Sequence, residues 1–343
     1  MIGLMKLEPG PGHLALRDLP EPQPGPGEVV IEVEAAGLCA SDLHIRDWDI
    51  QLNLRPPVVI GHEFAGRIHR VGKDVAGLEP GQQATSETAF SVCGSCMPCR
   101  AGEYNACARK ELIGYVHDGC FAKYVRVPAE RVHLLPPGIG TLEAAVCEPL
   151  AAVVRGTLEL TRIAPGDMVV VAGPGPIGLL ALQVARSAGG VVVVCGTSGD
   201  ESRLELAAKL GAAATVNVAQ ESLLEALRGM GCAEGADVYL ECSGAAPSVR
   251  AGLEATRRRG QFTLIGLPNK PLEMDFAKIA YKELTVRGSI GQRWTAWRTA
   301  LHLLSTKKVD TRVLITHTFP LADWRRAFEC FEAREGLKIA FVG

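Results

Sequence analysis

The stretch Met168–Gly178 reads MVVVAGPGPIG and decides the fold of the second half of the chain. Its apolar start is typical of a buried strand, its glycines fit G-x-G-x-x-G, and a helical pattern follows over Ile177–Ala188. Gly173 permits a tight turn, Gly175 lets a pyrophosphate approach the backbone, and Gly178 lets the helix pack closely on the strand. The free N–H groups at the helix start favour phosphate. The context predicts a dinucleotide-binding turn, with an ordinary glycine-rich turn as the alternative.

Strands and helices alternate on both sides of this turn. Helical patterns cover Pro149–Leu160 and Arg203–Leu210. Further short apolar strands are expected at Val191–Cys195, Thr215–Val218, Asp237–Glu241 and Gln261–Ile265. This β-α-β rhythm predicts a doubly wound parallel sheet, a Rossmann-type α/β domain over residues 151–290.

The end of the second strand bears on the choice of nicotinamide cofactor. A site specific for NAD usually places Asp or Glu about 20 residues past the glycines, to hold the ribose hydroxyls. Here Thr197 and Ser198 stand at the strand end, and Asp200 and Glu201 come slightly later. Thr197, Ser198 and Arg203 are candidates to hold a 2′-phosphate, or the first two simply cap the next helix. The sequence favours NADP and leaves NAD open.

The first part of the chain, residues 1–150, is rich in glycine and proline. Short strand patterns at Glu28–Ala35, Phe64–Val71 and Phe121–Val127 are separated by turn signals, which predicts a mostly antiparallel β domain with long functional loops. Residues 291–343 add helical segments and a closing strand, Lys338–Val342, and are expected to return to the first domain.

Composition excludes several classes of protein. The chain has 343 residues, 47% of them hydrophobic and 22% charged, with a net charge of -2 and no dense basic run. These values predict a folded protein with two domains and no nucleic-acid partner. The apolar runs are shorter than the ~18 residues of a membrane span, and the start has no signal-peptide pattern. We therefore expect a cytoplasmic protein, in which clustered cysteines are metal ligands or catalytic groups and not disulfides.

Four of the eleven cysteines form a compact cluster. The spacing C-x2-C-x2-C-x7-C within residues 90–110 fits a closed tetrahedral structural zinc site. An iron–sulfur cluster is the rival interpretation, and unligated cysteines the simplest one. The residues are Cys93, Cys96, Cys99 and Cys107.

A second group of candidate ligands is spread over three segments. Cys39 lies in GLCASDLH, His62 and Glu63 in GHEFAG, and Glu148 in CEPL at the domain junction. Together they offer soft, borderline and hard ligands for a zinc ion that keeps an open position. Each residue alone is more often structural.

These motifs, in this order, resemble the zinc-containing medium-chain alcohol dehydrogenase family. The resemblance rests on GHE at 61–63, the C-x-S-D-x-x-H segment from Cys39, the four-cysteine lobe, EPL at 148–150, the glycine-rich turn and DVYLECSG at 237–244. It is strongest to the polyol (sorbitol) and threonine dehydrogenase branch, and it implies a GroES-like catalytic domain before the Rossmann domain.

The resemblance also implies residue roles. Cys39 and His62 would bind the catalytic zinc, with Glu63 and Glu148 supplying the remaining ligand directly or through water. Asp42 would orient His62, and Ser41 and His44 would relay the proton of the substrate. A second zinc would fill the lobe, which gives two per chain. The positions that match the cofactor lining are Ile177, Ile265, Leu267, Ser289 and Ile290.

The expected reaction is oxidation of a secondary alcohol or polyol to a ketone, with hydride transfer to NAD(P)+. A threonine 3-dehydrogenase is the near alternative, since Arg287–Gly291 resembles that branch, and a non-catalytic binding protein of the same fold is the distant one. Polyol dehydrogenases carry an Arg-aromatic pair where this chain has Gly291 and Gln292, and a histidine where it has Arg155. Arg46, Arg155 and Arg293 are candidates to bind the carboxylate of an amino acid. By resemblance we expect a homo-oligomer, a tetramer or dimer, with a small alcohol as its substrate.

Overall fold

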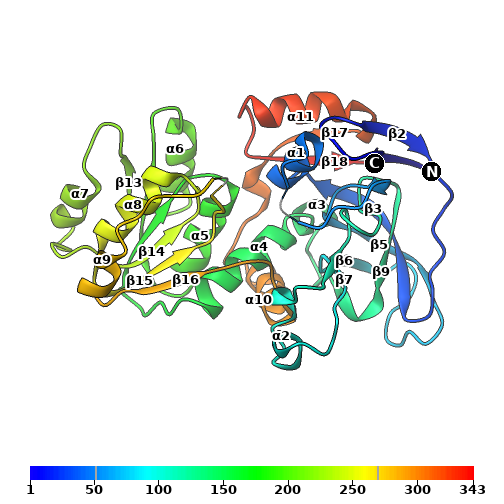
Figure 1. The fold of residues 1–343 in the computed structure, drawn as a ribbon, viewed down its shortest axis with the longest axis horizontal. Helices are drawn as coiled ribbons and strands as arrows, with labels where there is room; N and C mark the ends of the chain where they lie inside the picture. Colours follow the sequence, from blue (N-terminus) through cyan, green and yellow to red (C-terminus); the bar gives the residue numbers. More distant parts are fainter. Residues whose placement is uncertain (51, 269) are drawn as a thin grey trace. The chain divides into compact units, whose positions relative to one another are not determined.

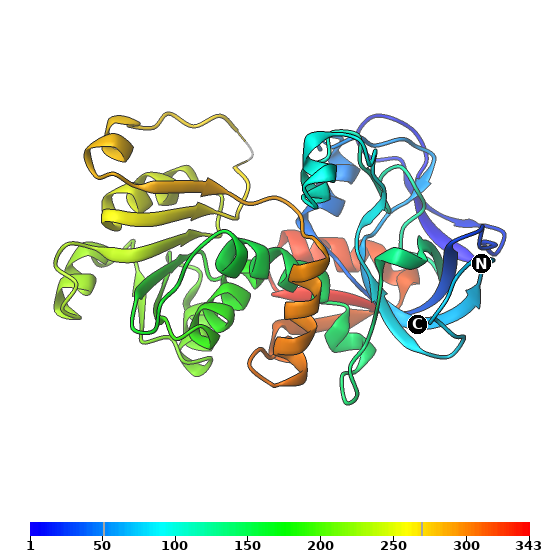
Figure 2. The same ribbon diagram turned by 90° about the horizontal axis from the view of Figure 1, so that it is seen from below.

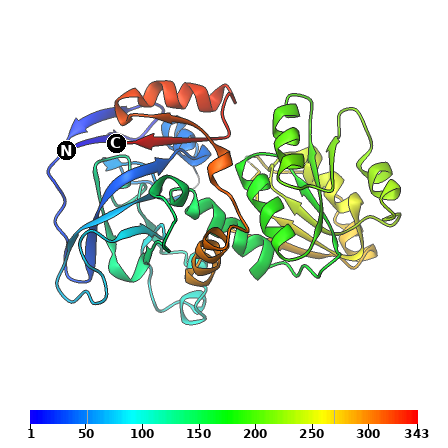
Figure 3. The same cartoon turned by 180° about the vertical axis from the view of Figure 1, so that it is seen from behind.

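The computed structural model describes residues 1–50, 52–268 and 270–343. The chain divides into two compact units (Figure 1). Unit 1 comprises Met1–Pro149, Gln292–Ser305 and Thr311–Gly343, and unit 2 comprises Leu150–Gly291 and Thr306–Asp310. Both chain ends belong to unit 1 (Figure 3).

Unit 2 is built on a parallel sheet with the strand order β13-β12-β11-β14-β15-β16. The order reverses beside β11, as in a doubly wound fold. Its strands are β11 (Met168–Ala172), β12 (Val191–Gly196), β13 (Ala214–Asn217), β14 (Ala236–Glu241), β15 (Thr256–Leu264) and β16 (Thr285–Gly288). The prediction of a doubly wound α/β domain is confirmed.

Helices lie on both faces of this sheet (Figures 1 and 2). Strands covered on both faces must be apolar throughout, and Val169, Val170 and Val171 of β11 are fully buried. The helices are α5 (Pro176–Ser187), α6 (Glu201–Lys209), α7 (Leu223–Gly229), α8 (Ala246–Ala255) and α9 (Ala277–Tyr281). A π-helix, η3 (Arg155–Glu159), continues α4 (Cys147–Val154).

Unit 1 contains a mostly antiparallel sheet with the order β10-β6-β5-β3-β18-β17, and β9 also pairs with β3. Only β17 and β18 are parallel to each other among its described strands. The strands are β3 (Glu28–Gly37), β5 (Glu63–Val71), β6 (Gln83–Ser86), β9 (Tyr124–Pro128), β10 (Val132–Leu134), β17 (Ile315–Phe319) and β18 (Lys338–Val342). Smaller sheets join β2-β1-β4 and β7-β8. Their strands are β1 (Ile2–Lys6), β2 (Leu14–Asp18), β4 (Val58–Val59), β7 (Ala89–Ser91) and β8 (Glu111–Leu112).

Helices complete unit 1, and two of them, Ala40–Asp47 and Trp324–Glu332, contribute buried side chains to the same apolar core as the sheet. Phe64, Phe121 and Phe328 are among its largest buried side chains. The helices are α1 (Ala40–Asp47), α2 (Met97–Arg100), η1 (Tyr104–Ala106), η2 (Ala129–Arg131), α3 (Thr141–Ala144), α10 (Trp294–Ser305), η4 (Arg312–Leu314), η5 (Leu321–Asp323) and α11 (Trp324–Glu332).

Some predicted boundaries were wrong. The strand predicted at Phe121–Val127 begins only at Tyr124, because the backbone of Phe121 bonds to Leu4 and Ile60 outside the ladder with β3. The edge strand β16 is exposed along its whole length and ends at Gly288. None of the described helices is long and apolar enough to cross a membrane.

Candidate functional site

Strand pairing brings the first cluster together. Cys39 follows β3 and caps α1, while Glu63 is the first residue of β5 and His62 directly precedes it. The two strands are antiparallel with Gly37 opposite Glu63, so the end of one lies beside the start of the other. The ligand atoms of Cys39, His62 and Glu63 lie within 4.8 Å of one another. Among the described residues this group does not include Glu148.

Asp42 lies behind His62 in this cluster. Its Oδ2 accepts the backbone N–H of Cys39 at 2.9 Å, and its Oδ1 lies 3.8 Å from Nδ1 of His62. Burial raises the pKa of Asp42 to about 6, although His62 opposes that shift. Burial alone would lower the pKa of His62, but contacts with Cys39 and the charge of Asp42 outweigh it and raise that pKa to about 10.

The cluster has the character of a metal site. The buried Nδ1 of His62 and Oδ1 of Asp42 have no hydrogen-bond partner among the described residues. A thiol, an imidazole and a carboxylate together match the ligand types that zinc prefers. The donor set therefore fits a zinc ion, and the anionic groups around it would be balanced by a cation.

Lys338 is a member of the cluster that sequence reasoning missed. Its Nζ contacts Oε2 of Glu63 and donates to the carbonyl of Leu38 at 3.0 Å. The side chains of Lys338 and Glu63 are 5% and 1% exposed. Burial alone would lower the pKa of Lys338, but Glu63 raises it, so the lysine remains a cation beside the candidate ligands.

Glu148, in α4, lies near the cluster and is held by another chain segment. Gln292 donates Nε2 to Oε1 of Glu148, and Gln292 is itself buried. Burial raises the pKa of Glu148 to about 7, while the positive charge of His62 opposes the shift. Gln292, which stands where polyol dehydrogenases carry part of an Arg-aromatic pair, thus contacts the candidate ligand Glu148.

Ser41 and His44 occupy one turn of α1. Ser41 Oγ lies 3.5 Å from Nε2 of His62, and Nδ1 of His44 lies 2.8 Å from Oδ1 of Asp49. Residues three apart lie on the same face of a helix. The ring of Tyr115, another residue that the sequence did not single out, is 5.6 Å from that of His62.

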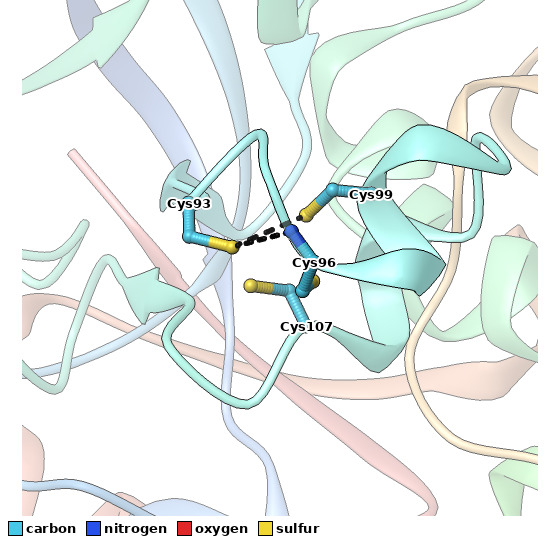
Figure 4. Close-up of side chains that lie close together, drawn as sticks. All are labelled: Cys93, Cys96, Cys99 and Cys107. Atoms are coloured by element: carbon cyan, nitrogen blue, oxygen red, sulfur yellow. Dashed lines mark hydrogen bonds between the residues drawn. The ribbon is translucent and has the colours of Figure 1, made fainter.

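The four cysteines of the lobe, residues 93–107, point toward one another (Figure 4). Their sulfur atoms lie within 4.8 Å, and Gly94 and Gly102 take positive φ angles that let the chain wrap around them. Backbone N–H groups of Cys96 and Ser95 lower the pKa of Cys93 to about 5, whereas desolvation raises that of Cys99 to about 12. A thiolate is already favoured at Cys93, as a metal-binding cluster requires.

The glycine-rich turn has the geometry that its sequence requires. Gly173 has a φ of 96°, and a Cβ there would lie 2.7 Å from Cβ of Ser243. Gly175 caps α5 with open space around it, and a Cβ on Gly178 would collide with the carbonyl of Gly173. The backbone at the start of α5 is therefore accessible to a ligand.

Glu241 fixes the loop beside that turn. This fully buried carboxylate accepts the backbone N–H groups of Ser243 at 2.7 Å and Gly244 at 2.9 Å. It also accepts the hydroxyls of Ser243 and Ser248. A charged acceptor with several donors is a strong tether, so Glu241 holds the loop that contacts Gly173.

At the end of β12 the acid Asp200 is turned toward its own loop. Its Oδ2 accepts from the backbone N–H and the hydroxyl of Thr197, each at 3.1 Å. Oδ1 lies 3.8 Å from Arg203, and Asp200 is buried. Ser198 is exposed and lies 3.4 Å from the amide of Asn217.

The remaining candidate cofactor residues lie in unit 2. Leu267 and Ile290 are exposed large apolar side chains, 61% and 46% accessible. A Cβ on Gly156 would lie 2.7 Å from Ile265 and 3.4 Å from Ser289, so the π-helix packs closely on both. Ile177 is the second residue of α5.

The three arginines considered for a substrate carboxylate all have acidic partners. Arg46 makes two hydrogen bonds to Glu332, at 2.6 and 2.7 Å, and also pairs with Asp47. The other two pairs are Arg155 with Glu159 at 2.9 Å and Arg293 with Glu103 at 2.6 Å.

Comparison with known proteins now identifies the family. Residues 25–137 match the alcohol dehydrogenase GroES-like domain, and residues 176–306 match the zinc-binding dehydrogenase domain. The chain belongs to the zinc-containing medium-chain alcohol dehydrogenase family. The GroES-like and Rossmann architecture and the family resemblance are thereby confirmed, and the chain is an oxidoreductase of the alcohol dehydrogenase type.

Relatives cover almost the whole chain. The sorbitol dehydrogenase of Halalkalibacterium halodurans is 40% identical over 340 residues, 99% of this chain and 98% of that protein. The L-threonine 3-dehydrogenase of Bacillus subtilis is 35% identical over 100% of this chain and 98% of its own length. A structure described as a zinc-binding dehydrogenase from Sinorhizobium meliloti 1021, bound to NADP, superposes with a TM-score of 0.91 at 30% identity, covering 100% of this chain and 99% of the other.

Proposed function

We propose that this chain oxidises a secondary alcohol of the polyol type to a ketone and passes the hydride to NADP+ or NAD+. The observation that carries the proposal is the buried cluster of Cys39, His62 and Glu63, whose ligand atoms lie within 4.8 Å. We propose one zinc held by these residues together with Glu148, and a second in the four-cysteine lobe.

Each chain residue has a defined task in this reaction. Bound zinc would supply Lewis acidity to the substrate hydroxyl, and the nicotinamide would accept the hydride. Asp42 orients the ring of His62, and Lys338 holds the carboxylate of Glu63. Because Lys338 already neutralises Glu63, we propose Glu148 as the direct ligand and Glu63 as a group that acts through water.

The proton of the substrate needs a way out of the site. We propose that Ser41, which lies beside His62, receives it, and that His44 on the same face of α1 delivers it to solvent. Asp49 holds the ring of His44, whose side chain is 31% exposed. Imidazole is suited to this task because it exchanges protons near neutral pH.

Paired arginines support a neutral substrate. An amino acid such as threonine would require a cation for its carboxylate, and Arg46, Arg155 and Arg293 are each engaged by an acid. Gln292 adds an amide next to Glu148 instead of a charge. The sorbitol dehydrogenase relative, at 40% identity, agrees with this preference, and a threonine dehydrogenase is the second candidate.

The end of β12 supports NADP. Asp200 is occupied by Thr197 and is buried, so it is poorly placed to accept ribose hydroxyls. Ser198 and Arg203 are proposed to hold the 2′-phosphate, and the glycine-rich turn to hold the pyrophosphate. The relative of known structure that is bound to NADP agrees with this choice.

We further propose a cytoplasmic homo-oligomer, either a tetramer or a dimer. The eleven cysteines of the chain form no disulfide, as expected where thiols stay reduced. Light scattering on the purified protein would give the mass in solution, and a monomer would contradict the oligomer.

Absorbance at 340 nm tests the activity. Purified protein is given polyols, simple secondary alcohols or L-threonine, each with NADP+ and with NAD+, before and after removal of metal by a chelator. We expect NADPH formation with a polyol, its loss on chelation and its absence in Cys39→Ser. Cys232→Ser, outside both clusters, is the matched control. A zinc-containing protein that is inactive with every alcohol would contradict the proposal, and activity confined to L-threonine would replace the polyol.

A further inference from the structure

The last loop of the four-cysteine lobe contacts the start of α10. The backbone N–H of Trp294 donates to the hydroxyl of Tyr104 at 2.6 Å. We propose that Tyr104 is a positioning residue of the Cys39 metal site: by fixing the start of α10 it keeps Gln292 on the carboxylate of Glu148. The inference rests on the proposed function, because the role of Glu148 as a ligand is part of that proposal.

Tyr104 is itself rigidly held. Its hydroxyl donates to Oε2 of Glu87 at 2.7 Å, and the guanidinium of Arg131 lies 4.2 Å from the centre of its ring. Glu87 is 1% exposed and also lies 3.2 Å from Nε2 of His133. The hydroxyl therefore donates one bond and accepts another, which leaves Trp294 little freedom to move.

A second contact joins the same two segments. Nη1 of Arg293 lies 2.6 Å from Oε1 of Glu103, the residue before Tyr104. Farther along α10, the ring of Trp297 stacks on His133 with a centroid distance of 5.3 Å. The lobe and the β-sheet thus hold Trp294 and Trp297 of α10 and Arg293 directly before it, so the first turn of this helix has a defined position.

Gln292 transmits this position to the metal site. It is two residues from Trp294, its side chain is buried, and it donates to Glu148. Hydrogen-bond partners of a metal ligand typically change metal affinity 10–100-fold when removed, because they orient the ligand. Displacement of Trp294 moves the backbone that carries Gln292, so the lobe influences a site to which it contributes no ligand.

The test is zinc release from the full-length protein to a colorimetric chelator, followed in time. Cys39→Ser identifies the phase that belongs to the Cys39 site, because that phase disappears. Tyr104→Phe removes both hydroxyl bonds and should speed this phase about tenfold, while release from the lobe changes less than about twofold. Tyr281→Phe, which removes an exposed hydroxyl in unit 2, should change neither phase.

A double-mutant cycle separates positioning from general loosening. Gln292→Ala should speed the Cys39 phase at least as much as Tyr104→Phe, and the double variant should be no faster than Gln292→Ala alone. Arg293→Gln weakens the second contact without altering the lobe and should act in the same direction, which preserves the test if Tyr104→Phe misfolds.

The outcomes distinguish the two proposals. The positioning role alone is overturned if Tyr104→Phe shows two release phases and the rate of the Cys39 phase is unchanged. It is also overturned if the rate increases caused by Tyr104→Phe and Gln292→Ala multiply in the double variant. If the Cys39→Ser variant retains as much zinc as the wild type, the proposed catalytic site is overturned.

Discussion

Replacing Lys338 by methionine tests the electrostatic balance of the Cys39 cluster. The substitution keeps most of the side-chain volume, so any cavity is small. It removes a cation that is 5% exposed and contacts Glu63, which is 1% exposed, and it leaves the carbonyl of Leu38 without this donor. Breaking a buried ion pair from one side typically costs about 3–5 kcal/mol. We expect Lys338→Met to destabilise metal-free unit 1 by that amount, or roughly 6–20 °C in its midpoint.

Tryptophan fluorescence during urea unfolding measures this effect. The four tryptophans of the chain, at 48, 294, 297 and 324, all lie in unit 1, so their signal reports that unit. Metal-free protein is used so that only the protein's own charges face Glu63. The exposed pair of Lys123 and Glu32, 3.6 Å apart, provides the control, and Lys123→Met should cost less than about 1 kcal/mol.

The double variant Glu63→Gln with Lys338→Met should be more stable than either single variant, because the remaining unpaired charge is gone. A cost below about 1 kcal/mol for Lys338→Met would refute the reasoning, since such a value belongs to an exposed pair. Single effects that simply add in the double variant would show that the two side chains are not coupled.

Three further outcomes follow from the site. Burial raises the pKa of Glu148 from 4.5 to about 7 in the folded protein. The unfolded chain therefore releases this proton at a lower pH than the folded chain, and the metal-free protein should lose stability as pH rises through that range. Urea midpoints of wild type and Glu148→Gln that differ by a constant amount from pH 4.5 to 7.5 would contradict this. Arg203→Ala should lower kcat/KM for NADP+ about tenfold and leave NAD+ unchanged in steady-state assays; an equal loss for both would exclude contact with a 2′-phosphate. Glu241→Gln should destabilise unit 2 by about 1–3 kcal/mol in calorimetry and raise KM for both cofactors, because the backbone N–H of Gly244 loses a charged acceptor. An unchanged KM would show that Glu241 does not position the turn.

The sequence predicted the parts of the site that are local in the chain. The glycine-rich turn at Gly173–Gly178 and the lobe from Cys93 to Cys107 are contiguous, so spacing alone suggests their chemistry. The conformation of each follows from its glycines. The assignments of individual ligand and cofactor residues stay predictions.

Contacts between distant segments were not predictable in the same way. Lys338 lies 300 residues from Leu38, and no local pattern distinguishes a lysine in a closing strand from a solvent-exposed one. The acidic partner of Arg46 is 286 residues away, so the sequence could offer this arginine only as a candidate for a substrate carboxylate.

The order of strands in unit 1 has a consequence for biosynthesis. Strand β18 lies between β3 and β17, although it follows all of unit 2 in the sequence. Unit 2 is synthesised before β18 and can fold while translation continues, whereas Ala35, Ala36 and Gly37 of β3, which pair with β18 and not with β9, lack that partner strand at this stage. Unpaired edges promote aggregation. Newly made chains therefore pass through a stage at which unit 2 is complete and unit 1 still lacks β18, so deletion of β18 should reduce the yield of native protein.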